Sequence, residues 1–220
     1  MQNILQPMLK RDFHPGISGL YALTPDDSNT AELLRKVRLA FTGGARILQY
    51  RNKIASRALQ REQAGALSDL CNEFSALLII NDDVKLAQQV NAHGVHLGGT
   101  DGSIAEARTL LGVDKLIGVS CYNQLSLALE AANQGADYIA FGSFFASTVK
   151  PGAVHADLDL LRQARRELAL PIVAIGGINV QNGSELLAAG AHALAVISAV
   201  FSAPDIELAA KQFANLNYYQ

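Results

Sequence analysis

The strongest constraint on the fold is a regular alternation, along 220 residues, of short apolar runs and longer segments of helical period. The runs are rich in Val, Ile, Leu, Tyr and Phe. They are apolar throughout rather than at every second position, which is typical of parallel strands buried on both faces. Eight such runs occupy residues 19–23, 47–50, 77–80, 94–97, 116–119, 138–141, 172–175 and 193–197.

Helical segments separate these runs, at about 30–41, 56–74, 84–90, 103–111, 124–133, 157–168 and 180–189, and a last one follows at 205–216. Glycine-alanine pairs beginning at Gly44, Gly135 and Gly190 stand between a helix and the next run, where glycine ends a helix in the left-handed conformation. Eight repeated units predict one (β/α)8 barrel domain over residues 1–220, with a short N-terminal arm at about 1–16. A doubly wound open sheet is the alternative.

The composition excludes several classes of partner. The net charge of −2 gives no basis for bulk binding to nucleic acid or to an anionic membrane. The apolar runs fall short of the roughly 18 residues of a membrane helix, and the N-terminus lacks the apolar core of a signal peptide. Cys71 and Cys121 form neither a disulfide framework nor a zinc spacing. We expect a soluble cytoplasmic protein, and the sequence leaves room for a homo-oligomer.

In a barrel of this kind the site lies where the strands end. Polar, charged or glycine residues follow seven of the eight runs, and we expect them to form one polar face. In chain order they are Gln49 to Lys53, Asn81 to Asp83, Gly98 to Asp101, Ser120, Ser147 to Lys150, Gly176 with Gly177, and Ser198.

The charges on this face suggest a metal and a diphosphate. Asp82 and Asp101 follow neighbouring strands, and two carboxylates with phosphate oxygens and waters suit Mg²⁺. Cations can hold the phosphates; they are Arg51, Lys53 and Lys150. The alternatives are helix N-caps for the aspartates, more readily for Asp83 than for Asp82, and solvated loops for the cations.

A second anion site is indicated by Gly176-Gly177 and Ile197-Ser198, because the loops after strands seven and eight commonly bind phosphate. The alternative is a tight turn. Two anions on one face imply two phosphorylated substrates, and hence a transferase or condensing enzyme. His96 lies inside the fourth run, where it either faces the barrel mouth or is a satisfied core histidine. Cys121 is read as an inert small residue.

The chain resembles a known family, the thiamine-phosphate synthases, over residues 20 to 200. The resemblance rests on motifs whose order and spacing are specific: Gln49-x-Arg51-x-Lys53, Asn81-Asp82-Asp83, GVHLGGTD ending at Asp101, GVS ending at Ser120, GADYIAFGSFFASTVK ending at Lys150, AIGGI ending at Ile178, and AVISAV from Ala195.

The resemblance implies a (β/α)8 barrel that joins a hydroxymethylpyrimidine diphosphate to a thiazole phosphate carboxylate, with Mg²⁺ as cofactor. Pyrophosphate leaves first, through a pyrimidine carbocation, and the thiazole nitrogen attacks the exocyclic carbon. Decarboxylation and release of thiamine phosphate follow. The implied partners are therefore small-molecule substrates.

The resemblance also implies roles for matched positions. The implied catalytic residues are Arg51, Lys53, Ser120 and Lys150. The same four residues are implied to bind the pyrimidine diphosphate, with Gln49, Asn81, Tyr50 and Asn52. Asp82 and Asp101 hold Mg²⁺. The thiazole substrate is held by Ser147, Thr148, Val149, Gly177, Ile197 and Ser198. Tyr21 and His96 line the pyrimidine pocket.

Two positions depart from the family pattern. Val149 stands where a second hydroxyl is usual, and Gly99 stands where glutamine is usual. Both departures add weight to two alternative functions, a thiazole tautomerase-like isomerase and a non-catalytic phosphate-binding barrel. Neither alternative needs the paired aspartates.

Overall fold

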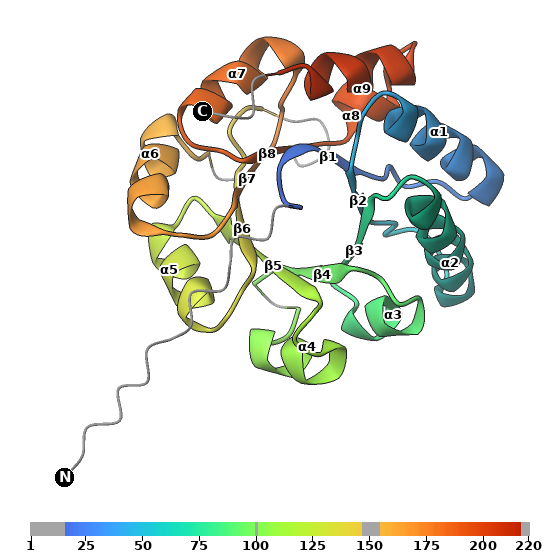
Figure 1. Ribbon diagram of the computed structural model, residues 1–220, viewed down its shortest axis with the longest axis horizontal. Helices are drawn as coiled ribbons and strands as arrows, with labels where there is room; N and C mark the ends of the chain where they lie inside the picture. The colour runs from blue at the N-terminus through green and yellow to red at the C-terminus, as the bar shows by residue number, and fades with distance from the viewer. Residues whose placement is uncertain (1–15, 100, 147–154, 217–220) are drawn as a thin grey trace.

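The computed structural model describes residues 16–99, 101–146 and 155–216 and confirms the predicted barrel. Eight parallel strands close into a ring in sequence order, with helices around the outside (Figure 1). The strands are β1 (Gly19–Leu23), β2 (Ile47–Tyr50), β3 (Leu77–Asn81), β4 (Gly94–Leu97), β5 (Leu116–Tyr122), β6 (Tyr138–Phe141), β7 (Ile172–Ile175) and β8 (Ala193–Val196).

The helices follow the predicted segments to within a few residues. They are α1 (Thr30–Thr42), α2 (Arg57–Glu73), α3 (Val84–Gln89), α4 (Ile104–Leu111), α5 (Leu125–Asn133), α6 (Leu158–Glu167), α7 (Val180–Ala188), α8 (Ser198–Phe201) and α9 (Ile206–Ala214). Several predicted starts prove to be N-caps rather than helical residues, because a side-chain oxygen accepts a backbone N–H from the first turn. These caps include Ser56, Ser103, Asp157 and Asp205.

Three strand ends differ from the prediction. β5 continues past Val119 to Tyr122, because a register shift between Ser120 and Tyr122 lets it keep pairing with β6. β3 gains Asn81 and β8 stops at Val196, one residue before the predicted end. The four-residue helix α8 was not predicted, since one turn is too short to show a helical period.

The apolar core has two layers, which explains why the strands are apolar on both faces. The inner layer fills the barrel and includes Tyr21, Ile79, Tyr138 and Val173, while the outer layer lies between the sheet and the helices. Gly118 makes room for one inner side chain, since a Cβ at this position would overlap the ring of Tyr138. The barrel is therefore packed closed, and its open end lies where the strands finish.

Some sequence predictions fall outside the described residues. Residues 1–15 of the predicted N-terminal arm are among these. So are Ser147, Thr148, Val149 and Lys150, which belong to the segment 147–154. Within the described ranges, no helix combines the length and the apolar character that a membrane crossing requires.

Candidate functional site

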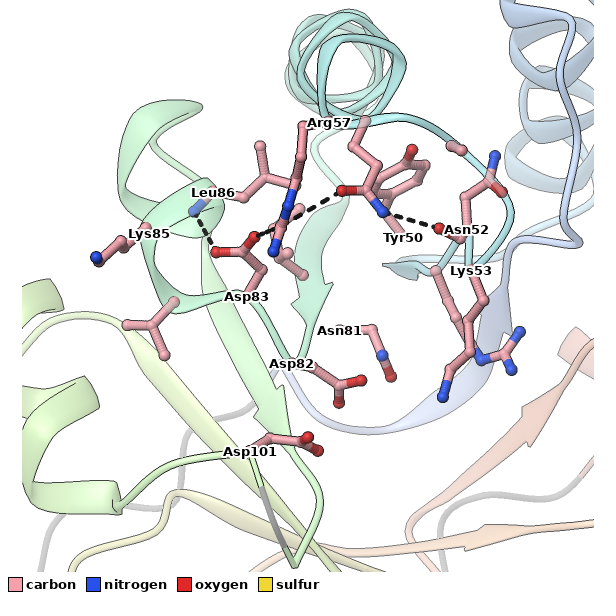
Figure 2. Close-up of a pocket in the computed structure, with 15 residues that line it drawn as sticks. Tyr50, Asn52, Lys53, Arg57, Asn81, Asp82, Asp83, Lys85, Leu86 and Asp101 are labelled. Carbon is pink, nitrogen blue, oxygen red and sulfur yellow. Dashed lines mark hydrogen bonds and ion pairs between the residues drawn. The ribbon is translucent and has the colours of Figure 1, made fainter.

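A cavity of about 730 Å³ opens at the carboxyl ends of β2 and β3 and extends to the loop after β4 (Figure 2). The sequence predicted that polar residues of these three units would meet, and the structure brings them together. The predicted site residues that line the cavity are Tyr50, Arg51, Asn52, Lys53, Asn81, Asp82 and Asp101.

Asp82 and Asp101 form a close carboxylate pair at the inner end of this cavity. Burial raises the pKa of Asp82 to about 6, and the hydrogen bond and negative charge of Asp101 act in the same direction. The backbone of Asp82 has a φ of 63°, a left-handed conformation that is uncommon for non-glycine residues but that aspartate adopts more readily than most. Two carboxylates that share a site repel each other unless a proton or a cation lies between them.

The structure shows which of the three aspartates is a helix N-cap. Asp83 caps α3, because its carboxylate accepts the Leu86 N–H at 2.9 Å, and it also pairs with Arg57. Ser103 caps α4 in a capping box with Glu106. Asp101 is therefore not a helix cap; its carboxylate accepts the Gly98 N–H at 2.9 Å and stays at the cavity.

The donor set suits a hard divalent cation. The described residues include no cluster of three or more His, Cys, Asp or Glu side chains that could enclose a metal by themselves. Two carboxylates suffice for Mg²⁺, which retains waters and takes further oxygens from a substrate phosphate. The pair Asp82 and Asp101 thus fits a metal that is completed by its substrate.

Two cations from the loop after β2, Arg51 and Lys53, line the same cavity as the carboxylate pair. Arg51 pairs with Asp26 at 3.5 Å, and the Lys53 amide donates to the same Asp26 carboxylate at 2.8 Å. The Lys53 ammonium is close enough to Asp82 to oppose the rise in the pKa of that carboxyl. Figure 2 shows the Lys53 side chain extending toward Asn81 and Asp82. A diphosphate in this cavity would meet positive charge on one side and the carboxylates on the other.

The side chains of Tyr50 and Asn52 bond to helix α2. The Tyr50 hydroxyl donates to Gln63 of α2 at 2.9 Å, and the Asn52 amide donates to Gln63 at 3.0 Å. Both side chains are almost completely buried. Their polar ends therefore bond to α2, behind the loop that carries Arg51 and Lys53.

A chain of buried polar side chains crosses the barrel interior beneath the mouth. Gln49 donates to the Tyr21 hydroxyl at 2.9 Å, and that hydroxyl lies 2.9 Å from the hydroxyl of Tyr138. The two ring nitrogens of His96 lie 3.1 Å from the Tyr138 hydroxyl and 2.9 Å from the Ser120 hydroxyl. Burial lowers the pKa of His96 to about 4, so its imidazole is neutral near pH 7.

This chain links Gln49, Tyr21, His96 and Ser120, all of which the sequence placed in the site. Tyr138 was missed, because it lies inside an apolar run and its partner Tyr21 is 117 residues away. The signal that could have identified it is Gly118, whose missing side chain leaves space for a large ring. Cys121 is buried, and burial raises the pKa of its thiol to about 12, which agrees with an inert residue.

The predicted second anion site lies across the barrel mouth, at the paired strands β7 and β8. Gly177 has a φ of 62°, and a Cβ there would overlap the carbonyl oxygen of Ala146. The loop after β7 therefore packs directly against the residues that precede Ser147. Ile197 is the N-cap of α8 and Ser198 is its first residue, so their backbone lies at the end of β8.

Comparison with known proteins shows one consistent family. Residues 20–200 match the family model described as thiamine monophosphate synthase. A thiamine-phosphate synthase of Methylobacillus flagellatus is 55% identical over 202 residues, covering 92% of this chain and 96% of the relative. That of Nitrosospira multiformis is 52% identical over 200 residues, covering 91% and 86%.

The solved structure of thiamine phosphate pyrophosphorylase from Pyrococcus furiosus superposes with a TM-score of 0.79 at 36% identity. It covers 90% of this chain and 94% of that one.

Proposed function

The chain belongs to the thiamine monophosphate synthase family, and we propose that it carries out the reaction of this transferase family at the mouth of the barrel. In that reaction the nitrogen of a thiazole phosphate carboxylate replaces pyrophosphate on the exocyclic carbon of a pyrimidine diphosphate, and the carboxylate is then lost as carbon dioxide. The observation that supports this location best is the cavity in which Arg51 and Lys53 face Asp82 and Asp101.

Asp82 and Asp101 would hold Mg²⁺, which when bound neutralises negative charge on the leaving pyrophosphate. Arg51 and Lys53 hold the diphosphate oxygens and stabilise the charge that they gain as the carbon–oxygen bond breaks. Asn81, beside Asp82, supplies a neutral contact to the same group. Lys150, predicted from the sequence to assist, belongs to the segment that the structure does not describe.

The interior polar chain forms the floor on which the pyrimidine ring rests. Gln49, Tyr21 and Ser120 offer neutral donors and acceptors to the ring nitrogens and amino group. Because His96 is neutral, it adds no positive charge beneath a carbon that becomes cationic when pyrophosphate leaves. The floor is therefore compatible with a dissociative substitution that needs no protein nucleophile.

The thiazole phosphate takes the opposite side of the mouth. Gly177, Ile197 and Ser198 supply backbone N–H groups or a hydroxyl for its phosphate, and Ser147, Thr148 and Val149 are expected to complete the pocket. The thiazole nitrogen then approaches the pyrimidine carbon from the side away from the departing pyrophosphate.

A thiazole tautomerase-like isomerase acts on the thiazole phosphate alone, so it needs no metal and diphosphate site such as Asp82, Asp101, Arg51 and Lys53 would form. A non-catalytic phosphate-binding barrel does not need this site either. The cytoplasmic location and assembly into a homo-oligomer stay predictions from the sequence.

Release of pyrophosphate tests the proposal. The purified protein is incubated with the pyrimidine diphosphate, the thiazole phosphate carboxylate and Mg²⁺, and each component is omitted in turn. We expect release only when all three are present, together with formation of thiamine phosphate. Tight binding of the thiazole phosphate without any release would instead support the isomerase or the binding barrel.

A further inference from the structure

Gln63 is a completely buried glutamine on α2 that no part of the proposed chemistry uses. Its side-chain oxygen accepts hydrogen bonds from the Tyr50 hydroxyl at 2.9 Å and from the Asn52 amide at 3.0 Å. Its own amide nitrogen donates to the carbonyl oxygen of Asp27 at 3.0 Å. One side chain thus connects the end of β2, the loop that follows it and the loop after β1.

The pattern of donors and acceptors around Gln63 is specific for an amide. Asn52 also donates to the Asp27 carbonyl, at 2.7 Å, so donors and acceptors alternate around the cluster. Glutamate would set a second acceptor against that carbonyl, and an apolar side chain would leave the buried Tyr50 and Asn52 donors without this partner. Leaving a buried donor unpaired is costly, so the Tyr50 and Asn52 donors favour an acceptor at position 63. Among the described residues, the Asn52 side-chain oxygen is the one buried side-chain polar atom without a hydrogen-bond partner.

Further hydrogen bonds, from residues around this cluster, hold the backbone that carries the two cations. Arg51 is held through both its amide and its carbonyl by the Thr24 hydroxyl, at 2.8 Å in each case. The Lys53 amide is held by Asp26. Asn52 stands between them, and its carbonyl oxygen accepts a hydrogen bond from Gln60 of α2 at 3.0 Å, drawn in Figure 2.

We propose that Gln63 is a positioning residue for the diphosphate site, which fixes the segment Arg51-Asn52-Lys53 so that its two cations face Asp82 and Asp101. The inference rests on the proposed function of this mouth. It assigns Tyr50 and Asn52 an action on the substrate through the loop rather than by contact. It also explains why the side chains of Tyr50 and Asn52 are buried, whereas Arg51 is half-buried and Lys53 is exposed.

The variant Gln63→Met tests this, because methionine fills a similar volume and offers neither the donor nor the acceptor of the amide. We expect the dissociation constant for inorganic pyrophosphate with Mg²⁺, and the KM for the pyrimidine diphosphate, to rise about tenfold or more. This follows from the loss of the two hydrogen bonds that Gln63 accepts from Tyr50 and Asn52. The KM for the thiazole phosphate should stay within about twofold, since only the diphosphate half is disturbed.

Ser68→Ala is the matched control. Ser68 lies on the same helix and donates to the Val90 carbonyl at 3.1 Å, remote from the cations. Its loss should lower the melting temperature without weakening pyrophosphate binding. Pyrophosphate binding by Gln63→Met equal to that of Ser68→Ala would overturn the proposal.

Tyr50→Phe keeps the ring and removes one hydrogen bond to Gln63, so it tests the proposal even when Gln63→Met does not fold. We expect pyrophosphate to bind about threefold more weakly, and we expect no further loss when the change is added to Gln63→Met. Unchanged binding in Tyr50→Phe would contradict the proposal. Failure of the proposed function is distinguishable, because the unmodified protein would then form no thiamine phosphate.

Discussion

The hydroxyl of Tyr122, at the end of β5, accepts a hydrogen bond from the amide of Gly99 at 3.2 Å. A Cβ atom on residue 99 would lie 3.2 Å from the same hydroxyl, so tyrosine and glycine fit each other here. The pair involves the glycine at position 99, where the resemblance led us to expect glutamine. Tyr122 lies beside the loop that leads to Asp101.

Tyr122→Phe should therefore loosen the loop that presents Asp101. The loss of one partly exposed hydrogen bond, about 1 kcal/mol, predicts roughly fivefold weaker Mn²⁺ binding in the presence of pyrophosphate. Electron paramagnetic resonance of free Mn²⁺ measures this directly. Val113→Ala, a change at an exposed residue before β5, is the control and should bind Mn²⁺ normally. Equal Mn²⁺ binding by both variants would show that Tyr122 does not support the loop that carries Asp101.

The neighbouring aspartates Asp82 and Asp83 should separate function from stability. Asp83→Ala removes the N-cap of α3 and should cost about 1 kcal/mol of unfolding free energy while turnover persists. Asp82→Ala removes a carboxylate from the proposed metal pair and should abolish Mg²⁺-dependent turnover, with little loss of stability because the pair is repulsive. Thermal unfolding and pyrophosphate release measure the two effects. Full activity of Asp82→Ala would refute the metal assignment.

Gly177→Ala and Gly112→Ala compare two glycines with positive φ. Both glycines have positive φ, 62° and 87°, but only at Gly177 would the new Cβ overlap a neighbour, the Ala146 carbonyl. Each change should lower the free energy of unfolding by about 1 kcal/mol or more, because alanine is strained at a positive φ. Only Gly177→Ala should also raise the KM for the thiazole phosphate, by about tenfold or more. Similar kinetics for the two variants would show that the loop after β7 does not contact this substrate.

His192 predicts a loss of stability in acid. Its Nδ1 accepts the Ile172 N–H at 3.0 Å, and burial followed by the nearby Arg165 lowers its pKa to about 4. The unfolded chain therefore takes up this proton near pH 6.5, before the folded protein does. The unfolding free energy should fall as the pH decreases from about 6.5 toward 4. Urea unfolding across this range should show a shallower decline in His192→Asn than in the exposed control His155→Asn. Equal declines would rule out this histidine as the cause.

The sequence predicted the barrel and most of the ends of its strands and helices, because the strands are apolar on both faces and most helices begin at a recognisable cap, with α5 and α8 as exceptions. It predicted that Arg51, Lys53, Asp82 and Asp101 would meet, since they follow neighbouring parallel strands. It could not show that Tyr50 and Asn52 bond behind the loop, because this depends on Gln63, which the helical period alone marks only as a core position. Tyr138 was missed for a related reason, since its hydrogen bonds join residues from distant strands.

The central claim is that Asp82 and Asp101, with Arg51 and Lys53, form a metal and diphosphate site. Calorimetric titration of inorganic pyrophosphate, with and without Mg²⁺, into the unmodified protein and into Asp82→Ala tests it most directly. The account predicts that Mg²⁺ tightens pyrophosphate binding to the unmodified protein by about tenfold or more and has no such effect on the variant. Equal tightening by Mg²⁺ in both proteins would contradict it.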